Sequence, residues 1–191
     1  MNVRPLVEGL SELRSRTRSG ELAYFCLSGK SENHIRDLVS FNIARAHPTW
    51  LVQREIDRVD LTVTSRSRSP IRIEFKLGYA AVVAQTKGDC PAIRGVEKDF
   101  RKRPDPIVSC LGLMHFEGEE TDCLETYRNK SLIRRSLKSP STRQEAQEVV
   151  RMYWPNRSFR CVPVDCGRWN GLSVSIDFAV ISPGGRARGD H

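Results

Sequence analysis

Three charged side chains on two short segments carry the strongest chemical signal in this chain. Asp60 lies in residues 58–64, and Glu74 and Lys76 lie in residues 71–77. Both segments alternate strictly between apolar and polar residues, which is the period of a half-buried β-strand. The three charged residues belong to the polar sets, so they can share one face of a hairpin. Carboxylates and an ammonium group gathered in this way are suited to hold Mg²⁺ and to stabilise charge on a phosphate.

The segment between the two arms predicts how they pair. Its Ser, Arg and Pro residues are typical of a turn, which predicts an antiparallel hairpin. If the loop is centred on Ser67, Asp60 lies directly opposite Glu74 and Arg58 opposite Lys76. Facing residues have Cβ atoms roughly 4.5–5.5 Å apart, and opposed like charges are unfavourable. Two carboxylates held this close share a proton, meet a nearby cation or bind a metal ion.

Two alternatives remain open for this hairpin. Asp57 competes with Asp60, because the two acids are three residues apart and only one can join Glu74 in an unbroken strand. We prefer Asp60 because its neighbours continue the strand pattern cleanly. The other alternative is a purely structural hairpin, in which Lys76 and Arg58 form ordinary cross-strand ion pairs with the two carboxylates.

Asp60 followed by the triplet Glu-Phe-Lys at 74–76 resembles the metal-binding signature of the PD-(D/E)XK nuclease superfamily, which has the restriction-endonuclease-like fold. The first acid sits on one central strand and the triplet on its neighbour, as in that family. Val59, not Pro, precedes Asp60 here. The resemblance covers about residues 31–116 and is much weaker beyond them.

The resemblance implies a nuclease that depends on Mg²⁺ or Mn²⁺ and acts on DNA in preference to RNA. Asp60 and Glu74 would hold the metal ion, and Lys76 would position or activate the attacking water. Many members carry a helical glutamate at the metal site, and Glu32 fits that role as a further metal ligand and catalytic residue. Glu32 is equally well explained by its position near the positive end of a helix dipole. Many members also cut both strands as dimers, which implies a homodimer.

The elements expected around the hairpin make an α/β domain with a mixed central β-sheet flanked by helices, matching the restriction-endonuclease-like core. Helical spacing predicts helices, and alternation or unbroken apolar runs predict strands. The expected order is a helix over 31–46, a strand over 49–55, the hairpin, a helix over 91–103 and a buried strand over 106–116. Outside this core we expect helices over 5–17 and 123–139, and a connector over 166–171 between the two closing strands. We expect a single domain over 1–183 with a core at about 31–116, a helical flank at about 123–153, closing strands within 159–181 and a flexible tail at 184–191.

The balance of charge favours a polyanionic partner. The chain carries 31 Lys and Arg residues against 23 Asp and Glu residues, a formal net charge of +8. Four cations gather at the end of the helix over 91–103 and are predicted to contact phosphates of a nucleic acid: Lys98, Arg101, Lys102 and Arg103. A solvated helix end rich in cations is the plainer interpretation, and both remain open.

Six cysteines raise the questions of disulfides and zinc. The N-terminus lacks the apolar core of a secretory signal, and no apolar run is long enough to span a bilayer, so a cytoplasmic location without membrane contact is expected. Thiols stay reduced there. Cys161 and Cys166 have no second Cys or His pair to complete a zinc site, so buried free thiols are favoured.

The sequence therefore predicts a metal-dependent nuclease. The competing hypotheses are a catalytically inactive nucleic-acid-binding module of the same fold, and a nuclease that cleaves RNA. Two further polar residues in apolar strands, His115 and Asp177, are interpreted as structural.

Overall fold

The computed structural model describes residues 2–13, 20–29, 31–56, 59–66, 69–102, 107–139 and 142–183. Within them lies an α/β fold with one mixed six-stranded sheet, in the order β1-β2-β3-β4-β6-β5. The strands are β1 (Leu51–Ile56), β2 (Val59–Thr64), β3 (Ile71–Tyr79), β4 (Ile107–Glu117), β5 (Arg157–Trp169) and β6 (Leu172–Pro183). The helices are α1 (Arg4–Ser11), α3 (Glu21–Ser28), α4 (Ser31–Ala46), α5 (Ala80–Gln85), α6 (Pro91–Lys102), η1 (Asp122–Thr126), α7 (Lys130–Leu137) and α8 (Thr142–Tyr153).

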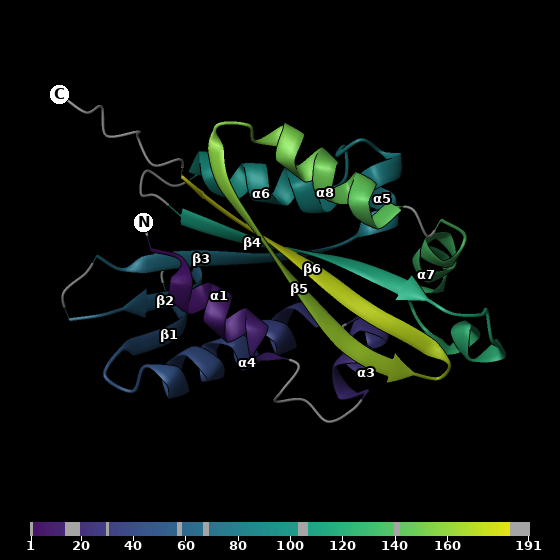
Figure 1. Ribbon diagram of the computed structural model, residues 1–191, viewed down its shortest axis with the longest axis horizontal. Coiled ribbons are helices and arrows are strands. Elements are labelled where there is room, and N and C mark those ends of the chain that lie inside the picture. Colours follow the sequence, from purple (N-terminus) through teal and green to yellow (C-terminus); the bar gives the residue numbers. More distant parts are fainter. Residues whose placement is uncertain are drawn as a thin grey trace.

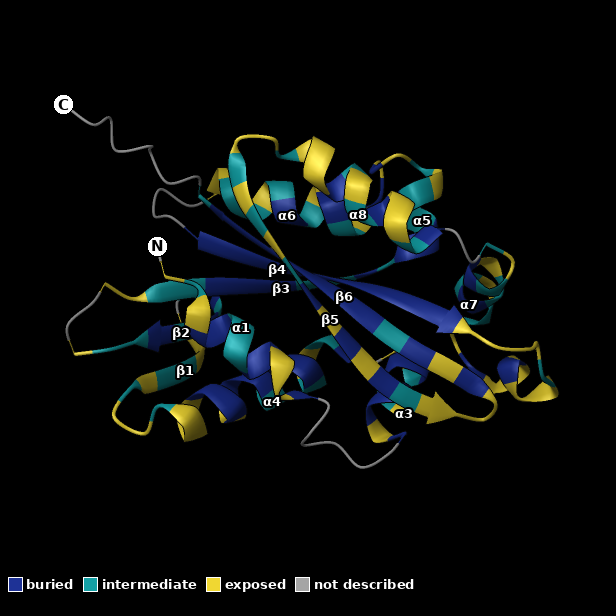
Figure 2. Ribbon diagram, in the orientation of Figure 1, coloured by how far each residue is buried: buried dark blue, intermediate teal, exposed yellow. Residues whose placement is uncertain are grey.

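Helices cover both faces of the sheet (Figure 1). The helices α1, α3 and α4 pack on one face, and α5, α6 and α8 pack on the other. The strand β4 runs between the two layers, pairs parallel with β3 and antiparallel with β6, and is buried along nearly its whole length (Figure 2). Its near-continuous apolar sequence is what a strand packed on both faces requires.

The helix α4 was predicted with the bounds that the structure gives it. Ile35, Val39 and Ile43 are spaced four residues apart and are fully buried against the sheet. This places the start of the helix, with Glu32 in its first turn, close to the middle of β3. The predicted helix over 91–103 and strand over 106–116 correspond to α6 and β4.

Two sequence predictions differ from the structure. The helix expected over 123–139 is divided into η1 and α7 by a turn. Of the first predicted helix, over 5–17, α1 covers the part up to Ser11, and residues 14–17 lie outside the described residues. The connector expected over 166–171 is only the two-residue turn Asn170–Gly171, and both residues have positive φ (47° and 83°). Asn-Gly favours this tight hairpin turn, so β5 continues to Trp169.

The strand β3 divides its side chains between the two layers. Ile73 and Phe75 belong to the core beneath α1 and α4. Since successive side chains of a strand point to opposite faces, Glu74 and Lys76 face the layer that contains α6. The predicted tail at 184–191 lies outside the described residues.

Candidate functional site

The hairpin of β2 and β3 has the register expected from a loop centred on Ser67. Leu61 pairs with Ile73, and the same register one step further brings Asp60 opposite Glu74. Pairing between the two strands is observed only as far as Leu61, whereas β3 continues to Tyr79 alongside β4. The candidate site lies along the part of β3 that pairs with β4 but does not pair with β2.

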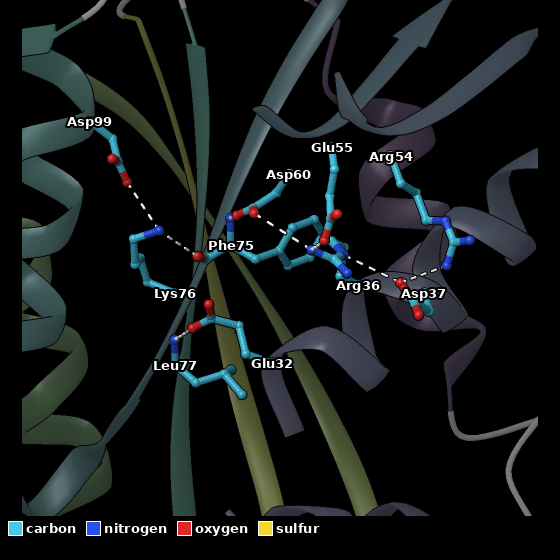
Figure 3. A network of polar contacts seen from close by, with 10 residues as sticks. All are labelled: Glu32, Arg36, Asp37, Arg54, Glu55, Asp60, Phe75, Lys76, Leu77 and Asp99. Atoms are coloured by element: carbon cyan, nitrogen blue, oxygen red, sulfur yellow. Dashed lines mark hydrogen bonds and ion pairs between the residues drawn. The ribbon is translucent and has the colours of Figure 1, made fainter. Parts of the chain in front are cut away.

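Two carboxylates accept hydrogen bonds from backbone amides in this part of β3 (Figure 3). The Phe75 amide donates to Asp60 Oδ2 at 2.8 Å, and the Leu77 amide donates to Glu32 Oε2 at 3.1 Å. Alternate amides of a strand point to the same side, so both bonds replace strand pairing that β2 does not provide. The helix α4 and the strand β2 thereby bring two acids to the same stretch of β3.

Glu74 is the most perturbed acid of the group. It is only 5% exposed, and burial raises its pKa to about 7. The charge of Asp60 and a hydrogen bond between the two carboxyl groups act in the same direction. Such a bond requires a proton on one of the partners, which agrees with the raised pKa of Glu74.

Lys76 points toward α6 instead of toward the carboxylate opposite. Its Nζ donates to the Phe75 carbonyl oxygen at 2.9 Å and lies 3.2 Å from Asp99 Oδ2 (Figure 3). Burial acts to lower the pKa of Lys76, but the carboxylates of Asp99 and Asp60 outweigh it and the pKa is raised. The ammonium group is therefore held in its charged form beside the two acids.

Glu32 lies at the same site but is bonded to the strand. Burial raises its pKa, while the charge of Lys76 acts against that rise. Within the described ranges, no three His, Cys, Asp or Glu side chains are arranged as a ready metal-binding group. Of the three acids predicted at the site, Asp60 and Glu74 interact with each other, and Glu32 accepts a hydrogen bond from the Leu77 amide nearby.

A buried arginine of α4 supports Asp60 from the far side. The Arg36 side chain is only 9% exposed, and its NH1 lies 2.9 Å from Glu55 Oε1 and 3.8 Å from Asp60 Oδ1. Its Nε lies 3.2 Å from Asp37 Oδ1, which also pairs with Arg54 (Figure 3). This network gives Asp60 a cation on the side away from Glu74.

Part of the predicted site lies outside the described residues. This applies to Asp57, the rival of Asp60, to Arg58, and to Arg103 at the end of the basic helix. The three remaining cations of the predicted nucleic-acid contact, Lys98, Arg101 and Lys102, are exposed on the last turns of α6. Arg101 also lies 3.8 Å from Glu97 one turn earlier.

Asp99 and Arg36 are the residues of the site that sequence reasoning missed. The four cations at the end of α6 predict a basic surface and draw attention away from the single acid among them. Its spacing is nevertheless informative, because Asp99 follows the buried residues Ile93 and Val96 at intervals of three and therefore lies near the buried side of the helix. Nothing in the pattern of α4 indicates that Arg36 turns inward.

The other polar residues singled out from sequence are structural. Asp177 on β6 is 1% exposed and accepts two bonds from Arg143 (2.8 and 2.7 Å) and one from Gln147 (2.8 Å). His115 Nε2 lies 3.5 Å from the same carboxylate. Burial alone would raise the pKa of Asp177, but the bonds from these neighbours outweigh it and hold that pKa below its usual range. The prediction of a satisfied buried carboxylate is confirmed.

All six cysteines are free thiols, four of them buried, with Cys123 exposed and Cys161 partly buried. Among the helices of the described segments, none combines the length and the apolar character that crossing a bilayer demands. Comparisons with protein-family models, with curated proteins and with solved structures give no match to this chain.

Proposed function

We propose that this protein is a divalent-metal-dependent nuclease that hydrolyses phosphodiester bonds in DNA. The observation that carries the proposal is the pairing of the buried Glu74 with the half-buried Asp60, with the Lys76 ammonium held nearby on the Phe75 carbonyl. The order of α4, the three antiparallel strands β1–β3, α6 and the parallel strand β4 supports a restriction-endonuclease-like core.

The residues at the site fit Mg²⁺ or Mn²⁺. Two adjacent carboxyl groups, one of them with its pKa raised to about 7, form a place where a divalent cation can replace a proton. Asp60 and Glu74 would hold the ion, and the Phe75 carbonyl oxygen would be a further oxygen ligand between Glu74 and Lys76 on β3. Mg²⁺ characteristically uses one or two carboxylates together with water and phosphate oxygens. When bound, the ion supplies Lewis-acid stabilisation of the phosphate and acidifies water.

The protein's own groups provide the remaining functions. The Lys76 ammonium has three donors; it donates one hydrogen bond to the Phe75 carbonyl oxygen and forms an ion pair with Asp99, so a donor remains for a water molecule or a phosphate oxygen. Its fixed positive charge stabilises the negative charge that develops on phosphorus oxygens. Glu32, held by the Leu77 amide, is positioned to accept a hydrogen bond from water at the same edge of β3.

The nucleic acid would lie along the last turns of α6. Lys98 and Lys102 are exposed on the helix that also carries Asp99 into the site, so phosphate contacts and the reacting group are close together. A net charge of +8 adds sequence-independent attraction to the polyanion.

Purified protein should be incubated in the presence of Mg²⁺ with one nucleic acid at a time: supercoiled plasmid, linear duplex DNA, single-stranded DNA or RNA. Cleavage by the wild type that disappears with a chelator, with Asp60→Asn and with Lys76→Met supports the proposal. Glu148→Gln, which alters an exposed carboxylate of α8 that accepts a bond from Gln144, is the matched control and should cleave normally. Equal products from the wild type, Asp60→Asn and Lys76→Met would contradict the proposal, and cleavage of RNA alone would change the substrate.

An inactive nucleic-acid-binding module of the same fold is the second candidate. Two observations favour it: Lys76 is already paired with Asp99, and the described acids form no three-ligand metal group. Binding of DNA that is unaffected by metal, without cleavage, would establish it. The predicted homodimer and cytoplasmic location are part of the proposal and are tested by analytical ultracentrifugation and by cell fractionation.

A further inference from the structure

The helix α6 carries a groove shaped for the side chain of Lys76. Gly95 lies against the lysine stem, and a methyl group added there would come within 3.2 Å of Lys76 Cδ and 3.3 Å of Cε. One helical turn later, Asp99 meets the ammonium group at 3.2 Å. A glycine and an aspartate four residues apart on one face of a helix therefore fit the stem and the charge of the same lysine.

The ammonium group has several anions within reach. The charges of Asp99, Asp60 and Glu32 all act on Lys76, and Asp99 is the strongest of them. Asp99 lies on α6, whereas Asp60 and Glu32 bond to amides on the β2 side of β3. In the observed arrangement Nζ bridges Asp99 and the Phe75 carbonyl and makes no ion pair with Asp60 or Glu74.

We propose that Asp99 is a positioning residue, which holds the Lys76 ammonium against α6 and keeps it from becoming the counter-ion of the Asp60–Glu74 pair. Without Asp99, the nearest remaining anions are the acids that the proposed function assigns to the metal ion, and the flexible lysine would move onto them. The Lys76 ammonium would then add to the charge of Arg36 at Asp60 and compete with a metal ion for the pair. This inference rests on the proposed nuclease function.

Asp99→Asn is the principal test, because it preserves shape and removes the charge. We expect kcat for DNA cleavage to fall roughly ten- to hundredfold, as displacement of a catalytic group by about 1 Å does, with little change in KM. Asp99→Glu restores a carboxylate at the end of α6 and should recover part of that loss. Asp89→Asn is the matched control, since it removes the exposed carboxylate that pairs with Arg94 of the same helix at 2.6 Å, and it should retain wild-type kcat.

Gly95→Ala separates positioning from stability. Alanine favours a helix interior over glycine, so the melting temperature should not fall, whereas the added methyl should displace the lysine stem and lower kcat. A variant that is stable and less active supports a groove fitted to Lys76. Wild-type kcat in both Gly95→Ala and Asp99→Asn would overturn the inference.

A crystal structure of Asp99→Asn gives a result that does not depend on catalysis. We expect Nζ of Lys76 to leave the Phe75 carbonyl oxygen and to approach Asp60 or Glu74. If Nζ keeps its bond to that oxygen, the inference is wrong even when the nuclease proposal holds. If the wild type does not cleave nucleic acid but the lysine moves in the variant, the nuclease proposal fails and the positioning role of Asp99 stands.

Discussion

Two buried carboxyl groups lie on the strands that flank β4, Glu74 on β3 and Asp177 on β6, and their surroundings shift their pKa values in opposite directions. Both are at most 5% exposed. Asp177 accepts bonds from a guanidinium and an amide, and its pKa is lowered. Glu74 faces another carboxyl group, and its pKa is raised to about 7. The first group has its charge compensated by the protein, whereas at the second the neighbouring acid Asp60 acts in the same direction as burial.

This difference separates a structural acid from a functional one. A buried charge that is fully paired stabilises a fold or fixes its arrangement, whereas two adjacent acids repel each other and cost stability in the absence of a ligand. The sheet holds one acid of each kind. Substitutions at the two positions should therefore act in opposite directions on stability, and only a substitution of Glu74 should strongly reduce activity.

The largest effect expected is on cleavage. Glu74→Gln removes a charge that the metal ion needs, and DNA cleavage in Mg²⁺ should fall by at least about a hundredfold, in the range of lost metal and acid–base groups. Asp177→Asn should keep most of the activity of its folded fraction. Rates normalised to folded protein by circular dichroism test this contrast, and a Glu74→Gln enzyme as active as Asp177→Asn would remove it.

The next effect is the pH dependence of stability. The folded-state pKa of Glu74, about 7, lies above its ordinary value of 4.5. The contribution of Glu74 to the free energy of unfolding is therefore fully present below pH 4.5 and is lost as the pH rises through 7. The free energy of unfolding should fall by roughly 3 kcal/mol between pH 4.5 and pH 8 in the absence of metal. Urea unfolding at intervals of one pH unit measures this, and Glu74→Gln should flatten the profile.

The contribution of Asp177 to the free energy of unfolding has the opposite pH dependence. Its folded-state pKa lies below the ordinary value of 3.8, so its contribution is present above pH 3.8 and is lost as the pH falls through the folded-state pKa. At pH 8, Asp177→Asn should reduce the free energy of unfolding by about 2 kcal/mol, the scale of bonds between charged groups. Glu74→Gln should raise it, because the destabilising charge is gone. Destabilisation of similar size by both substitutions at this pH would show that the two acids are not of different kinds.

The smallest effect is expected on the surface of α6. Lys98→Gln and Lys102→Gln should each weaken DNA binding only a few-fold and lower the slope of log K against log salt by about 0.9 per lost phosphate contact. Arg94→Gln removes a cation of the same helix that is already paired with Asp89 and is the control. Fluorescence anisotropy in Ca²⁺, at several salt concentrations, provides the slopes. Unchanged slopes in both lysine variants would exclude this face as the contact.

The local pattern predicted the hairpin, whereas it could not predict the partners of its charges. Alternation and the centre of the loop were enough to give the register that brings Asp60 opposite Glu74, and an unbroken apolar run identified β4. The pairing of Lys76 with Asp99 depends on how α6 is rotated over the sheet, and no single segment records that rotation. The bond from Leu77 to Glu32 likewise depends on where β2 stops pairing with β3, which follows from the whole sheet.

A crystal soaked in Mn²⁺, with its anomalous scattering recorded, tests the central claim most directly. The proposal predicts an anomalous peak between the carboxyl groups of Asp60 and Glu74 and none at Asp177, which serves as the internal control in the same crystal. Absence of a peak at the Asp60–Glu74 pair, at a Mn²⁺ concentration that saturates cleavage, would contradict the assignment of this pair as the metal site.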